Sequence, residues 1–304
     1  NAAKFQHFKA ETIVSDHGFK KLGKITHQKN WKDSVFETYK KASINPKWTK
    51  ILHKECKKNK IDFMCTPFDI SGAKEINKLV DIFKISSSDI TNYPLIKVIS
   101  KFKKPIVLST GASSINEINE AIKLIKKFHN KIILLHCVLN YPTKNHNAFL
   151  GLINVLKSKF KNIPIGYSDH TFENFNLNIL TAWLSGAVVI EKHFTHNKKL
   201  PGNDHYHSAD YKDLIELNKD FTQVINSMEN DITRKLKIEK KSRLNARRSI
   251  YTTRNLKKNH RIQINDIICK RPATGLHPKY FDKIIGKKIK KSKKEDAPIY
   301  MKDF

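Results

Sequence analysis

Residues 163–170 of the chain read IPIGYSDH, and residues 187–193 read AVVIEKH. Both stretches contain a short apolar run that ends in polar side chains capable of catalysis or metal binding. Five earlier runs have the same character and are separated by longer segments: Ala2–Phe8, Asp62–Thr66, Ile82–Ser86, Pro105–Ser109 and Lys131–Val138. From the second of these onward the repeat is about 20 to 30 residues, the length of one β-strand and one helix. Such a repeat predicts parallel strands with helical crossovers, and helices are expected at Ile115–His129 and Asn176–Leu184.

The number of runs favours a barrel. Seven strands in roughly 225 residues predict an α/β fold of the TIM type, a β/α barrel that lacks one of its eight units in this chain. A doubly wound open sheet is the alternative, but no Gly-rich phosphate-binding turn follows any of the runs. The polar ends of the runs support the barrel further, because the C-terminal ends of barrel strands carry the active site.

The chain changes character after residue 227. Residues 228–246 are polar and dense in charge, which predicts a linker between a barrel domain at 1–227 and a small, mostly β domain at 247–304. Residues 231–304 carry 23 basic and 7 acidic side chains, or +16 of the chain's net charge of +30. This charge favours an anionic partner. Lys and Asn are abundant throughout, however, and we interpret the charge chiefly as a compositional bias.

Cysteine usage and hydropathy predict a cytoplasmic protein. The four cysteines form no CxxC pair, which is typical of reduced thiols: Cys56, Cys65, Cys137 and Cys269. No apolar run approaches the roughly 20 residues of a membrane span, and nothing at the start reads as a signal peptide. Because Asn1 already lies next to a predicted strand, we expect this N-terminus to be a cut within a longer protein.

Seven motifs occur in order along the chain and carry a family resemblance. They are Thr66-Pro67-Phe68-Asp69, Phe83-Lys84-Ile85-x-Ser87, Leu108-Ser109-Thr110-Gly111, His136-Cys137 with Tyr141-Pro142, Gly166-Tyr167-Ser168-Asp169-His170-Thr171, Glu191-Lys192-His193-Phe194-Thr195 and Pro201-Gly202-x-Asp204-His205. Through them the chain resembles the sialic acid (N-acetylneuraminate) synthases and their legionaminate and pseudaminate relatives. Ala246-Arg247-Arg248-Ser249 and Lys270-Arg271-Pro272 extend the resemblance into the C-terminal antifreeze-like (SAF) domain of that family.

The resemblance implies a transferase that condenses phosphoenolpyruvate with the open-chain aldehyde of an N-acylated hexosamine. The products would be a nine-carbon 2-keto acid and inorganic phosphate. It places a divalent cation, most often Mn²⁺, on His170 and His193, and two imidazoles with open positions also suit Mg²⁺ or Co²⁺. It further implies a homodimer in which Arg271 of the SAF domain reaches the site of the partner protomer.

The family's substrate residues map onto the strand ends of this chain. For phosphoenolpyruvate the resemblance implies Lys4, Thr66, Lys84, Ser87, Ser109 and Ser168. For the sugar it implies Gln6, Phe68, Asp89, Tyr141, Asp204 and Arg271, and the catalytic set is Asp89, Lys84 and Tyr141. A lysine at the end of a buried strand is unfavourable without an anionic partner, which makes Lys4 and Lys84 the most informative of these positions.

The chain departs from the family pattern at several positions. Asp89 stands where the family usually has Glu, one methylene longer. Leu139 replaces a side chain that is polar in some relatives and leaves the identity of the hexosamine open, and Asn203 replaces a common proline. The family's first strand and its Glu-x-x-x-Asn-His loop are not in this chain, so we expect an open barrel with unpaired strand edges.

Two other functions are compatible with the sequence. One is a basic nucleic-acid- or polyanion-binding protein on a degenerate barrel scaffold, but no RNP-like, zinc-finger or helix-turn-helix motif supports it. The other is an unrelated metal hydrolase, but the carboxylate cluster expected for such an enzyme is missing. The sequence therefore predicts a synthase first.

Overall fold

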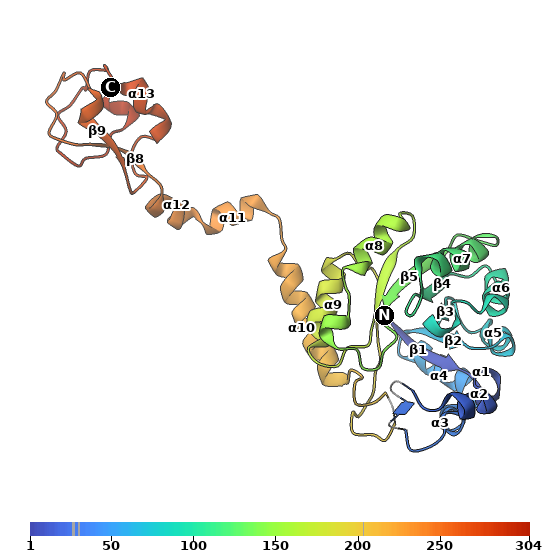
Figure 1. Ribbon diagram of the computed structural model, residues 1–304. Coiled ribbons are helices and arrows are strands. Elements are labelled where there is room, and N and C mark those ends of the chain that lie inside the picture. Colours follow the sequence, from blue (N-terminus) through green and yellow to red (C-terminus); the bar gives the residue numbers. More distant parts are fainter. Residues whose placement is uncertain (26–27, 30, 203) are drawn as a thin grey trace. The chain divides into compact units, whose positions relative to one another are not determined.

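A computed structural model of the chain describes residues 1–25, 28–29, 31–202 and 204–304 (Figure 1). Asn203, one of the departures noted above, lies outside the described residues. Contacts divide the chain into two compact units, Asn1–Ile225 and Asn226–Phe304.

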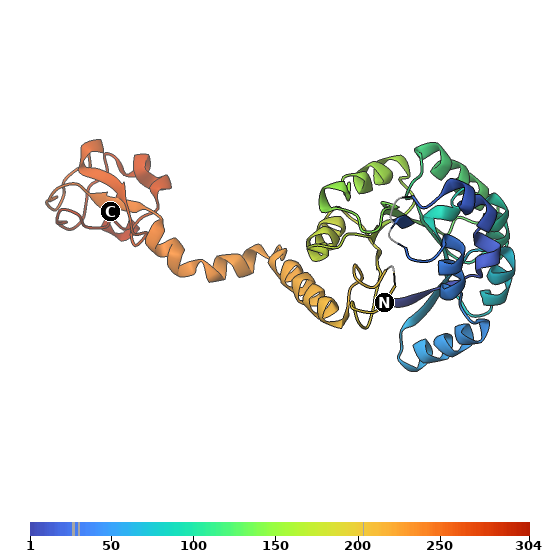
Figure 2. The same cartoon turned by 60° about the horizontal axis from the view of Figure 1, so that its bottom comes forward.

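The first unit is built on a parallel sheet. Within the described residues this sheet has seven strands in the order β1-β2-β3-β4-β5-β6-β7, and every neighbouring pair is parallel. The strands are β1 (Ala2–His7), β2 (Asp62–Pro67), β3 (Phe83–Ile85), β4 (Ile106–Ser109), β5 (Ile132–Cys137), β6 (Ile165–Asp169) and β7 (Ile190–Lys192). The sheet curls into a half-barrel with helices around its outer side (Figures 1 and 2). The α/β prediction is therefore confirmed, and β1 and β7 are the edge strands of this sheet.

The helices of this unit follow the strands in the expected alternation. They are α1 (Ala10–Ile13), α2 (Asp16–Leu22), α3 (Val35–Ala42), α4 (Pro46–Lys58), α5 (Ile70–Ile76), α6 (Tyr93–Lys101), α7 (Ile115–Lys126), α8 (Leu152–Lys159), α9 (Phe175–Leu184) and α10 (Tyr211–Ser227). Local sequence explains where several of them begin. Ser114 and Glu117 form a reciprocal capping box at the start of α7, and Asp69 caps α5 by accepting from the Gly72 amide at 2.7 Å.

The main core lies between the sheet and these helices and uses alternate strand residues. Phe83 and Ile85 of β3, Leu108 of β4 and Tyr167 of β6 pack there, and all are fully or nearly fully buried. Because side chains alternate across a strand, the residues between them point to the opposite, concave side of the sheet. Those positions carry the polar side chains described below.

The second unit has its own small core and sheet. β8 (Ser249–Thr252) pairs antiparallel with β9 (Ile267–Lys270), and α13 (Phe281–Ile284) follows. Ile250, Ile289 and Ile299 are fully buried at its centre. Between these strands, Arg261 forms an isolated bridge with Lys288, and Ile264 begins a 3₁₀ turn. Most of the predicted linker is helical, with α11 (Ile232–Ile238) and α12 (Lys240–Ala246).

Two predictions about the whole chain can be compared with the structure. The four cysteines are free, and three of them are buried. Among the described residues, no helix combines the length and apolar character needed to cross a membrane.

Candidate active site

Glu191 lies at the centre of a polar cluster on the concave side of the sheet. Lys84 Nζ is 3.5 Å from one of its carboxylate oxygens, and Lys4 Nζ is 4.0 Å from the other. The Ser168 hydroxyl donates to Glu191 at 2.9 Å. Strands β1, β3, β6 and β7 supply these residues, and each residue sits beside a strand neighbour that packs in the outer core. The prediction that the strand lysines need an anionic partner is thus met within the chain.

The charges in this cluster shift one another's protonation. Burial alone would raise the pKa of Glu191, but Lys84, Lys4 and the Ser168 hydroxyl outweigh it and lower the pKa to about 2. Burial lowers the pKa of Lys84, while the charge of Glu191 opposes that shift. Glu191 is therefore a carboxylate at neutral pH. Its distances to both lysines exceed those of close charged hydrogen bonds, so neither lysine is fully engaged.

Three more hydroxyl groups predicted for phosphoenolpyruvate are buried at neighbouring strand ends. Thr66 and Ser109 are each 2% exposed, and neither hydroxyl has a hydrogen-bond partner among the described residues. Ser87 accepts from the Gly111 amide at 3.0 Å and lies 3.6 Å from Cys137 Sγ. Buried hydroxyls are normally satisfied, so two without partners beside two loosely held lysines mark a place where a ligand can bind.

The two predicted metal ligands lie side by side at the ends of β6 and β7. The ring centres of His170 and His193 are 5.3 Å apart. His170 Nδ1 donates to the Val138 carbonyl at 2.7 Å, which leaves Nε2 as the nitrogen that can accept a cation. His193 Nδ1 lies 3.5 Å from an Asp204 oxygen. Burial lowers the pKa of His170 to about 4 and that of His193 to about 3, so both rings are neutral at pH 7.

This geometry fits a divalent cation at an open site. Two imidazoles that share an ion at about 2.1 Å place their ring centres roughly 5 Å apart, close to the separation found here. Among the described residues, no set of three or more His, Cys, Asp or Glu side chains forms a metal site. Two imidazole ligands would leave positions for water and substrate oxygens.

A buried ion pair holds the two histidine-bearing strand ends together. Asp169 and Lys192 are register partners on β6 and β7, and their charged groups are 2.7 Å apart. Asp169 is fully buried and also accepts hydrogen bonds from Tyr167 and Thr171. Since His170 and His193 are the next residues along each strand, this pair fixes how far apart the histidines lie.

Of the predicted catalytic residues, Tyr141 lies beside the histidines, whereas Asp89 contacts residues of its own loop. The Tyr141 ring lies 4.2 Å from the His170 ring and 5.8 Å from that of His193, so Tyr141 joins the histidine group. Burial raises the pKa of Tyr141 above its usual range, which keeps the phenol protonated. Asp89 contacts Asn92 and Ser88 on its own loop, and burial raises its pKa. Among the described residues Asp89 makes no ion pair with Lys84, so the structure does not join these two.

The remaining residues predicted to contact the sugar do not form one cluster in the structure. Asp204 lies against His193, Gln6 is exposed on β1, and Phe68 packs edge-on against Phe8 with ring centres 5.8 Å apart. Arg271 is exposed in the second unit.

Four residues of the site stand in the sequence motifs without a predicted role: Glu191, Asp169, Lys192 and His205. His207 lies outside those motifs. The signal for Glu191 was available. Two lysines on buried strands require a negative charge, and Glu191 lies near the end of another strand of the same sheet.

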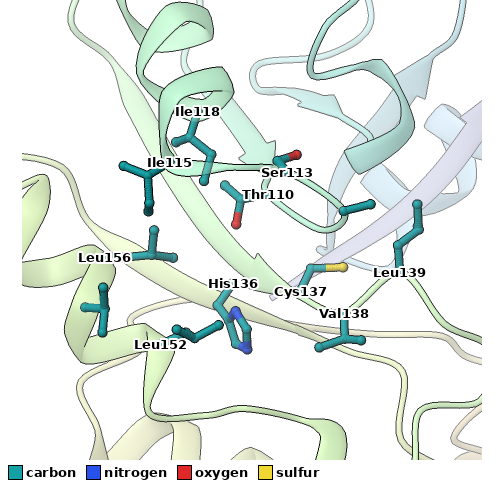
Figure 3. A pocket seen from close by; sticks show the side chains of 12 residues that line it. Thr110, Ser113, Ile115, Ile118, His136, Cys137, Val138, Leu139, Leu152 and Leu156 are labelled. Atoms are coloured by element: carbon teal, nitrogen blue, oxygen red, sulfur yellow. The ribbon is translucent and has the colours of Figure 1, made fainter.

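A largely apolar pocket of about 370 Å³ adjoins the site at the ends of β4 and β5. Figure 3 shows Ile115 and Ile118 on one side and Leu152 and Leu156 on the other, with Cys137 near the strand ends. Leu139, the departure from the polar residue of some relatives, lines this pocket and is 39% exposed. The pocket touches the histidine site through Cys137, whose sulfur is 3.7 Å from His170 Nδ1.

The half-barrel, the polar strand ends on its concave side and the neighbouring histidine pair together define a β/α-barrel enzyme. Residues 1–233 match the model of the NeuB family, and residues 247–304 match that of the SAF domain. The chain belongs to the NeuB family.

Known proteins resemble the chain over most of its length. An uncharacterized protein of Methanocaldococcus jannaschii is 37% identical over 100% of this chain and 86% of its own. The N,N'-diacetyllegionaminic acid synthase of Campylobacter jejuni is 35% identical over 97% of this chain and 89% of its own. The crystal structure of an N-acetylneuraminic acid (sialic acid) synthetase from Leptospira borgpetersenii, in complex with citrate, is 32% identical with a TM-score of 0.65, covering 80% of this chain and 81% of that one.

Proposed function

We propose that this chain condenses phosphoenolpyruvate with the open-chain aldehyde of an N-acylated hexosamine to give a nine-carbon 2-keto acid and inorganic phosphate. N-acetylmannosamine and 2,4-diacetamido hexoses are the candidate sugars. The relatives named as synthases of sialic and legionaminic acids support this reaction. The observation that carries it is the cluster of Lys4, Lys84 and Glu191 with the unpartnered hydroxyls of Thr66 and Ser109, next to the histidine pair.

The lysines and hydroxyls would hold the phosphate and carboxylate groups of phosphoenolpyruvate. Lys84 and Lys4 supply the positive charge, and the hydroxyls of Thr66, Ser109 and Ser87 supply donors around it. The contacts of Glu191 to the lysines are long, so an arriving phosphate can take over lysine N–H groups without breaking a close pair. The cluster is buried, which strengthens each of these electrostatic contacts.

The bond changes balance with one water molecule. C3 of phosphoenolpyruvate forms the new bond to the aldehyde carbon, whose oxygen takes one proton of the water. The remaining hydroxyl adds to C2, and the C2–O bond to phosphate then breaks, so that C2 becomes the keto carbon and phosphate leaves with the other proton. Tyr141 is protonated and next to both histidines, so we assign it as a hydrogen-bond donor near the reacting aldehyde. Asp89 is proposed as the acidic residue on the sugar side, with Gln6, Phe68 and Asp204 as further sugar contacts.

A divalent cation on His170 and His193, most simply Mn²⁺ with Mg²⁺ or Co²⁺ as substitutes, completes the proposal. When bound, the ion supplies Lewis-acid polarisation of the aldehyde oxygen and orients both substrates. The neutral rings, the engagement of His170 Nδ1 by the Val138 carbonyl and the ring separation support this assignment.

We also propose a cytoplasmic homodimer in which the second unit swaps onto the partner's barrel. Arg271 would then reach the N-acyl group in the partner's site. The exposed position of Arg271 and the free cysteines are compatible with these two proposals.

The experiment is a phosphate-release assay with phosphoenolpyruvate and Mn²⁺, in which N-acetylmannosamine and a 2,4-diacetamido hexose are offered in parallel. We expect release that needs both sugar and metal and that disappears in His193→Ala. The sugar that supports release identifies the substrate class, and mass spectrometry of the product confirms the nine-carbon acid.

Absence of release with every sugar, from a folded protein, would contradict the proposal. Nothing in the fold or in the comparisons supports the alternative of a nucleic-acid-binding protein on a degenerate scaffold. A binder of phosphate backbones would show affinity that falls steeply with salt concentration.

A further inference from the structure

His207 is a buried histidine that the proposed chemistry does not yet use. It is 1% exposed, and among the described residues neither of its ring nitrogens makes a hydrogen bond, although Nε2 lies 3.4 Å from an oxygen of Asp204. A buried polar group that makes no hydrogen bond is destabilising. An imidazole kept at such a position beside an active site is therefore a candidate for a functional role.

The backbone holds the His207 loop against the strand end that carries His193. The Ala209 amide donates to the His193 carbonyl at 2.8 Å, and the Thr195 amide donates to the Ala209 carbonyl at 2.8 Å. As a result the His207 ring centre lies 5.5 Å from that of His193 and 6.0 Å from that of Tyr141. His207 thus belongs to the same group of rings as the predicted metal ligands.

Asp204 lies between the two histidines. One of its oxygens is 3.4 Å from His207 Nε2, and the other is 3.5 Å from His193 Nδ1. The side chain of Asp204 is still 57% exposed, while that of His207 is fully buried. A single carboxylate therefore faces two imidazoles and keeps an open side for substrate.

We propose that His207 is a positioning residue that holds Asp204 against His193, and that Asp204 in turn orients His193 as a metal ligand. This inference rests on the proposed function, because it takes His193 to bind the divalent cation. A histidine that binds a metal usually donates its other N–H to a carboxylate or carbonyl, which fixes its tautomer and orientation. The Val138 carbonyl has this position at His170, and Asp204 has it at His193.

His207 acts through Asp204 in this account and does not bind the cation itself. Within the described part of the chain no three potential ligands form a metal site, so a third imidazole ligand is not preformed. Asp204 gains a second role beside its predicted contact with the sugar, since it links the sugar side of the site to the orientation of His193.

The test compares two amides at position 207. His207→Gln places an amide nitrogen near the former Nε2, where it faces Asp204 as the imidazole does, whereas His207→Asn places one near the former Nδ1. Mn²⁺ affinity is measured by electron paramagnetic resonance of the free ion in titrations of the folded proteins. We expect the Asn variant and His207→Leu to bind Mn²⁺ about tenfold more weakly than the wild type, and the Gln variant to bind within about twofold of it.

Equal affinity of the Asn and Gln variants would overturn the proposal, because a role in packing alone does not distinguish the two amides. Nitrogen-15 NMR of the imidazoles in the metal-free protein gives a second readout. We expect His193 to carry its proton on Nδ1 in the wild type and the Gln variant, and to lose this preference in the Asn variant. If the wild type bound no Mn²⁺, the metal assignment of the proposed function would fail, whereas the NMR comparison would still support or overturn the role of His207.

Discussion

Each unit of the chain buries a carboxylate among positive groups, but the two sites differ in how closely the groups meet. In the second unit, Asp266 is fully buried and receives Arg254 and His260 at 2.6 Å each and the Gln263 amide at 2.8 Å. In the first unit, Glu191 has its lysines at 3.5 and 4.0 Å.

The two carboxylate sites also differ in whether the hydrogen-bond donors near them have partners. Arg254, His260 and the Gln263 amide each donate a hydrogen bond to Asp266, while the hydroxyls of Thr66 and Ser109 have no hydrogen-bond partner among the described residues. A closely paired carboxylate serves the fold, and a loosely paired one with free donors nearby is arranged for a ligand.

The largest expected effect comes from removing the buried lysine of the loose cluster. Lys84→Met should lower kcat/KM for phosphoenolpyruvate by about 10³-fold, or about 4 kcal/mol of transition-state stabilisation, because the anion loses its most buried positive charge. Steady-state phosphate release measures the change. Lys101→Met, on the exposed end of α6, is the matched control and should leave the rate unchanged. A Lys84→Met enzyme within tenfold of wild type would show that the cluster does not bind substrate.

Asp266→Ala should have the opposite profile. We expect the free energy of unfolding of the second unit to fall by about 3 kcal/mol, because the buried Gln263 amide and two positive side chains lose their partner. Chemical denaturation followed by circular dichroism measures it, and the exposed Asp282→Ala is the control. Mn²⁺ affinity of the first unit should not change. A loss of stability no larger than that of the control would contradict the claim that the closely paired Asp266 stabilises the second unit.

The fold was predictable because its signals are local and repeated. Alternating strands, amphipathic helices such as α7 and the polar strand ends follow from residue spacing alone, and the family motifs located Lys84, His170 and His193 at or next to strand ends. Glu191 was in a motif but received no role, because its contacts with lysines on β1 and β3, which are not neighbours of β7 in the sheet, depend on how the sheet curls. A role for His207 could not be predicted from the sequence, because its place in the site depends on a loop that backbone hydrogen bonds hold beside His193.

We expect a smaller effect on kcat/KM from removing a hydroxyl without a partner, and an effect on stability from removing a hydroxyl that has one. Thr66→Val and Ser109→Ala should each lower kcat/KM for phosphoenolpyruvate about tenfold while changing the free energy of unfolding by less than about 0.5 kcal/mol. Ser168→Ala should instead destabilise the first unit by about 1 kcal/mol, because its hydroxyl donates to Glu191. Paired denaturation and kinetic measurements test this. Equal destabilisation by all three substitutions would mean that no donor is reserved for a ligand.

The smallest expected effect is a pH dependence of the second unit. Burial would raise the pKa of Asp266, but His260, the Gln263 amide and Arg254 lower it below its ordinary value of 3.8. A lowered carboxyl pKa contributes stability above pH 3.8 that is lost as the pH falls through the folded-state pKa. Denaturation of wild type and Asp266→Asn between pH 6 and 3 should give a shallower fall for the variant. Parallel curves would contradict the assignment of this carboxylate as a stabilising charge.

The central claim, that the loose cluster is a ligand site and the close one is not, is tested most directly by calorimetric titration of phosphoenolpyruvate. Wild type, Lys84→Met and Asp266→Asn are compared at a temperature where all three are folded. The account predicts saturable binding to wild type and to Asp266→Asn with similar affinity, and no detectable binding to Lys84→Met. Undiminished binding to Lys84→Met would contradict it.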